Sequence, residues 1–126
     1  MRAVDTNVLL RLVTRDDPKQ TTVAEQFVAK GAWVSHLVLA ETLWVRESVY
    51  ELGSDRIATA VEMLLSHANL TIQDSDVVSA ALKHYRRRSS LGFSDFLVLE
   101  IARKTGHVPL GTFDRRLGRV DGAQQL

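Results

Sequence analysis

The sequence predicts an α/β fold of three layers, in which helices cover both faces of a central parallel sheet of about five strands. Short apolar runs alternate with longer stretches whose apolar residues recur at helical spacing. Helical crossovers of this kind join strands that run parallel, and a parallel sheet needs helices on both of its faces. At 126 residues, with no repeat or linker, the chain is expected to form a single domain over residues 1–126.

The first half of the chain is expected to hold two strands, at residues 2–4 and 32–34, and three helices, at residues 16–31, 35–52 and 57–68. The first strand stops at Asp5. An aspartate followed by proline, at Asp17 and Pro18, is typical of a helix start, and Gly31 is typical of a helix end. Ser35 is placed to cap the helix that follows the second strand.

The second half is expected to hold strands at residues 70–72 and 108–113, two longer helices, a short basic helix and a weak terminal strand. Asp74 caps the first of the longer helices and Ser94 caps the second, which ends at Gly106. The apolar stripe of the second predicts that four of its side chains point inward: Leu97, Val98, Ile101 and Ala102.

Composition excludes several classes of protein. The chain has no cysteine, so disulfides, thiolate metal sites and cysteine nucleophiles are ruled out, and its four histidines are not at zinc-ligand spacing. A net charge of +1 indicates no particular partner. The apolar runs are too short to span a bilayer, and the N-terminus lacks the apolar segment of a signal peptide, so we expect a cytoplasmic protein that does not enter membranes.

Four acidic residues occupy positions where sites form in such a fold, outside the carboxyl ends of the strands. Asp5 follows the first predicted strand, and Asp114 follows the strand at residues 108–113. Glu41 lies on the helix after the second strand, and Asp95 lies in the first turn of its helix. The sequence therefore predicts that four carboxylates point towards one edge of the sheet.

Each acid also has an ordinary explanation. Asp95 and Asp114 could be helix-start residues, which stabilise a first turn by about 0.5–1 kcal/mol, and Asp5 could end a strand. Taken singly, these explanations are the better ones. Glu41 is harder to explain, because an unpaired carboxylate on a buried face costs several kcal/mol. Its neighbours at helical spacing predict such a face: Leu37, Val38, Trp44 and Val45.

Four converging carboxylates need either protons or a cation. Two carboxylates about 5 Å apart repel by about 3 kcal/mol at an effective dielectric constant of about 20. Oxygen ligands without a cysteine or histidine cluster favour Mg²⁺ or Mn²⁺. A pair of such ions suits in-line attack of water on a phosphodiester, a reaction that needs acidic ligands and no protein nucleophile.

The chain resembles the PIN-domain nucleases, and among them the VapC-type toxin ribonucleases of bacterial toxin–antitoxin pairs. The resemblance covers essentially the whole chain and lies in four segments that occur in the family's order: Val4–Leu10, Leu39–Thr42, Phe93–Leu97 and Thr112–Leu117. Each segment alone is a weak signal, whereas all four in order, in a chain of this length, are a strong one.

The resemblance implies that Asp5, Glu41, Asp95 and Asp114 carry the metal ions and are the catalytic residues. It also implies that polar side chains orient these acids: Asn7, Thr112 and Ser94. Asn7 is equally well explained as part of an Asx-type turn. Ser94 stands where some relatives carry another acid, so how tightly a second ion would be held stays open.

The resemblance further implies a substrate and partners. Family members of this type cut single-stranded regions of RNA with a metal-activated water. They form homodimers and are silenced by a small antitoxin whose C-terminal segment wraps the active-site groove, which gives heterotetramers or larger assemblies. We therefore expect a Mg²⁺- or Mn²⁺-dependent endoribonuclease toxin.

Basic and aromatic residues give weaker signals. Arginines near the acids could bind RNA phosphates. These arginines are Arg86, Arg87, Arg88 and Arg115. A solvated helix end explains Arg86, Arg87 and Arg88 as well. Trp33 and Trp44 lie in apolar patterns and are interpreted as core or dimer-interface residues.

Three other classes of protein share some of these features. A receiver domain could use Asp74 as its phosphorylated residue. It also needs an acidic pair directly after the first strand and a lysine after the last, and this chain has neither. A phosphatase of the haloacid-dehalogenase type needs a second aspartate where this chain has Asn7. A catalytically inactive PIN-like binding module is the remaining alternative, and the presence of all four acids argues against it.

Overall fold

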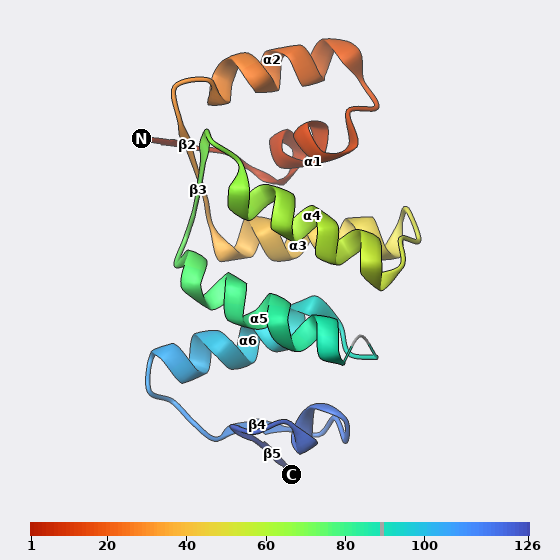
Figure 1. Cartoon of the computed structure of the whole chain (residues 1–126), viewed down its shortest axis with the longest axis vertical. Helices are drawn as coiled ribbons and strands as arrows, with labels where there is room; N and C mark the ends of the chain where they lie inside the picture. Colours follow the sequence, from red (N-terminus) through yellow and green to blue (C-terminus); the bar gives the residue numbers. More distant parts are fainter. Residues whose placement is uncertain (89) are drawn as a thin grey trace. The chain divides into compact units, whose positions relative to one another are not determined.

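The computed structural model describes residues 1–88 and 90–126, and these form six α-helices, one 3-10 helix and five short strands (Figure 1). The chain divides into two compact units, Met1–Ser75 and Asp76–Leu126. Each unit has its own parallel sheet and its own helices. None of the helices in the described part of the chain has both the length and the apolar character that a membrane crossing requires.

The first unit is built on a parallel sheet with the strand order β1-β2-β3. Its strands are β1 (Arg2–Ala3), β2 (Ala32–Val34) and β3 (Leu70–Ile72). Its helices are α1 (Thr6–Thr14), α2 (Pro18–Val28), α3 (His36–Ser48) and α4 (Ser54–Ser66). In the central strand β2, Ala32 and Val34 are fully buried, whereas Trp33 between them is 36% exposed. This alternation places one face of β2 in the core.

Side-chain caps explain where three helices of this unit begin. Asp5 caps α1, Asp17 caps α2 and Ser35 caps α3, and each accepts a hydrogen bond from a backbone N–H of the first turn. Pro18 is the first residue of α2, as the sequence predicts. Helix α1 is an addition to the predicted elements. Its short apolar run buries Leu9 and Leu10, and its nine residues are too few to display a helical period clearly.

The second unit packs two helices and a pair of parallel strands. These elements are α5 (Ser75–Arg87), α6 (Phe93–Lys104), β4 (Leu110–Thr112), the 3-10 helix η1 (Leu117–Arg119) and β5 (Ala123–Gln125). Strand β4 pairs with β5 in parallel, with Gly111 opposite Gln124. Phe93 and Phe96 of α6 are buried in the core, where the Phe93 ring meets Tyr85 of α5 edge-on.

A buried carboxylate connects the elements of this second unit. Glu100 of α6 is 7% exposed, and its Oε1 lies 2.9 Å from Nε2 of His84 and 3.4 Å from Nε of Arg103. Arg103 also donates a 2.7 Å hydrogen bond to the carbonyl of Asp121. Gly122 has φ +92°, a backbone conformation that L side chains rarely adopt, so the turn before β5 favours glycine.

The α/β class with parallel strands is confirmed, while the predicted size of the sheet is not. The five strands form sheets of three and two, and each strand is only two or three residues long. The strand predicted at residues 108–113 is limited to Leu110–Thr112, and the helix predicted to reach Leu52 ends at Ser48.

Two predictions about α6 are wrong. Its N-cap is Gly92, and Ser94 is already the second residue of the helix. At this end Asp95 Oδ2 accepts a hydrogen bond from the backbone N–H of Gly92, in place of the predicted serine cap. Val98 is 52% exposed and does not point inward, because the buried side of α6 runs through Phe96, Leu99 and Glu100.

Candidate active site

Asp5 lies between β1 and α1, at the N-cap position of α1. Its Oδ1 accepts a 3.0 Å hydrogen bond from the backbone N–H of Val8, which fixes the carboxylate at the start of the helix. Within the described residues its other oxygen has no hydrogen-bond partner from the protein. One oxygen therefore holds the side chain in place and the other is available to a ligand.

Glu41 lies in the middle of α3 and is held by a residue next to Asp5. Thr6 Oγ1 donates a 3.1 Å hydrogen bond to Glu41 Oε2, so the two acids of the first unit lie near each other. Thr6 thus contacts a candidate site residue, although it is not among the site residues that the sequence predicts. Its position directly after Asp5, at the first residue of a helix, is the signal that could have indicated it.

The predicted buried face around Glu41 is wrong. Leu37 and Trp44 are 69% and 63% exposed, and Glu41 itself is exposed. The side of α3 that enters the core instead carries Leu39, Thr42 and Leu43. Because α3 has apolar residues on nearly all sides, its helical period does not identify the buried one. The exposed Trp44 also excludes a core position for that tryptophan.

Asp95 and Asp114 belong to the second unit, and each is held by backbone N–H groups. Asp95 Oδ2 accepts from Gly92 N at 3.1 Å. Asp114 Oδ1 accepts from Arg116 N at 2.7 Å and from Leu117 N at 3.0 Å. Among the residues that the structure describes, the second oxygen of each carboxylate has no protein partner.

Two contacts position the turn that carries Asp114. The backbone N–H of Asp114 donates to Thr112 Oγ1 at 3.0 Å, so Thr112 contacts the backbone of Asp114, and its role in orienting the carboxylate stays a prediction. Arg116 Nη1 donates to the carbonyl of Ser90 at 3.1 Å. Ser90 lies just before α6, so this bond ties the Asp114 turn to the segment that leads into Asp95.

The other predicted site residues lie on the surface. Ser94 is exposed at the start of α6, and Asn7 is exposed on α1, where its side chain lines a cavity. The arginines predicted to bind RNA are also exposed, at the end of α5 and just after Asp114: Arg86, Arg87, Arg88 and Arg115. Their contact with RNA stays a prediction.

The donor set is chemically suited to a divalent cation. Each unit supplies two of the four acids. Among the described residues of either unit, no three histidine, aspartate or glutamate side chains lie close enough together to hold a metal ion. Three of the acids use one oxygen to cap a helix or turn and keep the other open. Fixed carboxylate oxygens are the ligands that Mg²⁺ and Mn²⁺ prefer.

A family comparison covers nearly the whole chain. The family model of the PIN domain matches residues 2–123, which include all four acids and parts of both units. The chain belongs to the PIN domain family. PIN domains are generally nucleases, so this assignment supports hydrolysis of nucleic-acid phosphodiester bonds. No curated protein matches the chain.

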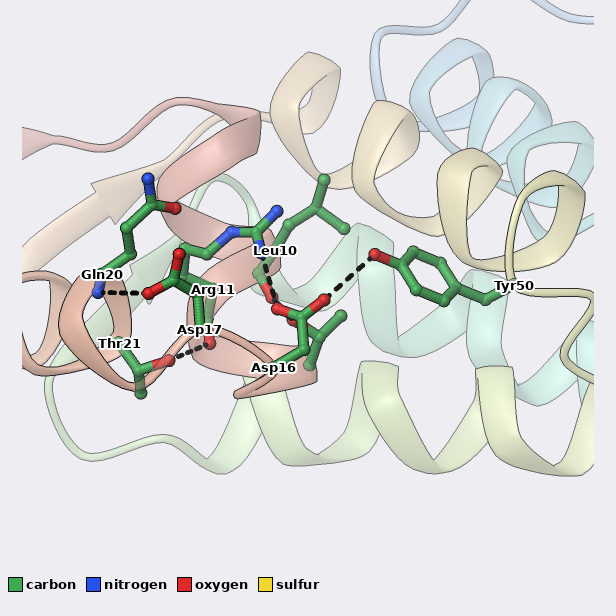
Figure 2. Close-up of polar contacts among 8 residues, drawn as sticks. Leu10, Arg11, Asp16, Asp17, Gln20, Thr21 and Tyr50 are labelled. Atoms are coloured by element: carbon green, nitrogen blue, oxygen red, sulfur yellow. Dashed lines mark hydrogen bonds and ion pairs between the residues drawn. The ribbon is translucent and has the colours of Figure 1, made fainter.

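A cavity of about 330 Å³ opens beside Asp5 in the first unit of this PIN domain, between α1 and α2. Arg11 contributes to its wall and is held by Asp16, with 2.6 Å between Arg11 Nη1 and Asp16 Oδ1. Figure 2 shows Arg11 and the Tyr50 hydroxyl converging on the Asp16 carboxylate from two sides. Thr14 Oγ1 donates to the same carboxylate at 2.8 Å.

The Asp16 cluster predicts a pH dependence of stability. The Thr14 hydroxyl and the Arg11 guanidinium lower the pKa of Asp16 below its ordinary value. The stabilisation by this carboxylate is complete above its pKa in the unfolded chain, about 3.9. It is lost as the pH falls through the lower pKa that Asp16 has in the folded protein. We expect Asp16→Asn to reduce the urea midpoint at neutral pH and to have a smaller effect near pH 2. If the difference in urea midpoint between the unaltered protein and Asp16→Asn grows at acid pH, the stabilising role of the Asp16 carboxylate is contradicted.

Proposed function

We propose that this PIN domain protein is a Mg²⁺- or Mn²⁺-dependent endoribonuclease and the toxin of a VapC-type toxin–antitoxin pair, with the whole chain acting as one domain. The observation that carries the nuclease proposal is the match of the PIN domain model over residues 2–123, which include Asp5, Glu41, Asp95 and Asp114. Asp5, Asp95 and Asp114 are each fixed by one or two backbone N–H groups through one oxygen, and among the described residues the other oxygen has no protein partner. Asp17 has the same geometry as an ordinary cap, so it is the place of the three acids in the family's segments that distinguishes them from it.

In this proposal Asp5, Glu41, Asp95 and Asp114 hold the divalent ions. Such ions, when bound, stabilise negative charge on phosphate oxygens and favour attack by water. The protein's own residues prepare the ligands. Backbone N–H groups fix three carboxylates before substrate arrives, and Thr6 restrains Glu41 through its 3.1 Å hydrogen bond. Ligands that need no reorganisation during the reaction contribute most to stabilising the transition state.

RNA as the substrate, and a small antitoxin as the inhibitor, are proposed from the resemblance in the four acidic segments. The exposed arginines of the second unit support a polyanionic substrate, because phosphate contacts supply most of the affinity of nucleic-acid binding. Cytoplasmic location and a homodimer that joins its antitoxin in a larger assembly are part of the same proposal. The exposed Trp44 offers apolar surface for such contacts.

The test is cleavage of total bacterial RNA by the purified protein, with Mg²⁺, with Mn²⁺ and with EDTA. We expect discrete fragments with either metal and none with EDTA, because carboxylates alone cannot neutralise the charge that develops on the phosphate. Expression without an antitoxin should arrest growth. Folded protein that cuts no RNA with either metal would support the inactive binding module instead.

A further inference from the structure

The cavity beside Asp5 combines apolar walls with unpaired carboxamides. Val8, Val23 and Phe27 supply apolar surface, and Asn7 and Gln20 supply one carboxamide each from two different helices. Gln20 uses its backbone N–H to bond Asp17, and in the described part of the chain neither carboxamide has a hydrogen-bond partner. The cavity therefore presents both donors and acceptors beside apolar surface.

Charge argues against an anionic occupant. The nearest cation on the wall is Arg11, and Asp16 already neutralises it at 2.6 Å. Asp5 adds a negative charge to the same wall. Among the described residues that line the cavity, a phosphate or carboxylate group would meet this charge with the neutralised Arg11 as the one cation. An uncharged occupant with apolar faces and polar edges fits these walls better.

The aromatic wall is held in place before any ligand arrives. The guanidinium carbon of Arg2 lies 3.8 Å from the centroid of the Phe27 ring, and Arg2 Nη2 donates to the Phe27 carbonyl at 3.1 Å. These two contacts fix both the side chain and the backbone of Phe27. A rigid wall of this kind loses little conformational entropy when a flat ligand packs beside it.

We propose that this cavity is a nucleobase subsite, which receives the base of a nucleotide next to the bond that is cut at the acids. A nucleobase is flat, uncharged and apolar on its faces, and its edges pair with asparagine and glutamine carboxamides. At about 330 Å³ the cavity has room for one base. This inference rests on the proposed nuclease function, and it assigns to Gln20 and Val23 a role in selecting the cleavage site.

The test measures binding of uncharged probes without metal or cleavage. Nuclear magnetic resonance spectra of the whole protein in EDTA would be recorded with adenosine, guanosine, cytidine and uridine, and with ribose as the control. We expect at least one nucleoside, and not ribose, to shift the Gln20 side-chain amide and the Val23 methyl signals. If no nucleoside shifts these signals, the inference is overturned, and the cavity is left to an apolar side chain of a protein partner.

Two matched variants sharpen the result. Val23 is 64% exposed, so Val23→Trp can fill the cavity while the core stays intact, and Val49→Trp changes an equally exposed valine of the same unit that does not line the cavity. Only Val23→Trp should remove the nucleoside shift of the Gln20 side-chain amide, a signal that both variants keep, and alter the base found at one position beside the cleaved bond. Shifts without any RNA cleavage would contradict the proposed function alone, whereas cleavage without shifts would contradict only the subsite.

Discussion

Asp5→Asn is expected to abolish RNA cleavage while the protein stays folded. Asparagine is as good an N-cap as aspartate, so its side-chain oxygen can still accept the hydrogen bond from Val8 N. What is lost is the negative charge that would hold the metal. Metal stabilisation of the transition state amounts to several kcal/mol, so the rate should fall at least about 100-fold. The measurement is fragment formation from total RNA with Mg²⁺ or Mn²⁺.

A second helix cap provides the matched control for this variant. Asp17 caps α2 in the same way, through Gln20 N at 3.1 Å, and is not one of the four acids. Asp17→Asn should therefore cut RNA at the rate of the unaltered protein. Circular dichroism should show the same folded spectrum for both variants. Equal activity of Asp5→Asn and Asp17→Asn would mean that Asp5 only caps its helix.

Glu100→Ala should have the largest effect on stability among single changes to polar residues of the second unit. The variant removes the carboxylate that His84 and Arg103 share, together with the packing of a side chain whose residue is 7% exposed. Loss of a buried ion-pair partner costs about 3–5 kcal/mol, and the partial exposure of His84 and Arg103 reduces this to about 2 kcal/mol. The measurement is the free energy of unfolding in urea.

The exposed pair between Asp76 and Lys104 is the control for burial. Their charged groups lie 3.0 Å apart, with side chains 69% and 43% exposed. Asp76→Asn should cost less than about 1 kcal/mol, because water and salt screen exposed pairs. If both variants lose the same stability, then burial of Glu100 does not strengthen its contacts.

The sequence predicts the strands and helices in order, apart from α1, because the residues that begin and end a helix act locally. Helix starts are recognisable without tertiary structure, because a capping residue acts within one helical turn. Examples are Asp17 with Pro18 at the start of α2, and Ser35 at the start of α3. The four acids are recognisable for a similar reason, since each lies at a fixed place relative to a strand or a helix start. Their resemblance to one family then depends on order along the chain, which the sequence displays directly.

What the sequence does not predict depends on packing between elements. Trp44 was expected on a buried face, but α3 is apolar on several sides and its neighbours decide which one enters the core. The role of Thr6 requires knowing that α1 lies beside α3, which brings its hydroxyl to Glu41. The cavity between α1 and α2 likewise exists only once both helices are placed.

The helix caps also limit which acid evolution or an engineer can place at each position. An aspartate carboxylate is one methylene from the backbone and reaches the N–H groups of its own turn, as Asp5 does. Glutamate is not among the residues favoured at N-caps. Exchange of Asp5 for glutamate would therefore loosen the start of α1 even though the charge is kept. Glu41 lies within α3 and does not cap a helix, so its longer side chain can extend further from the backbone towards a ligand. Helix geometry therefore accounts for an aspartate at Asp5 and leaves room for a glutamate at Glu41 before any metal is considered.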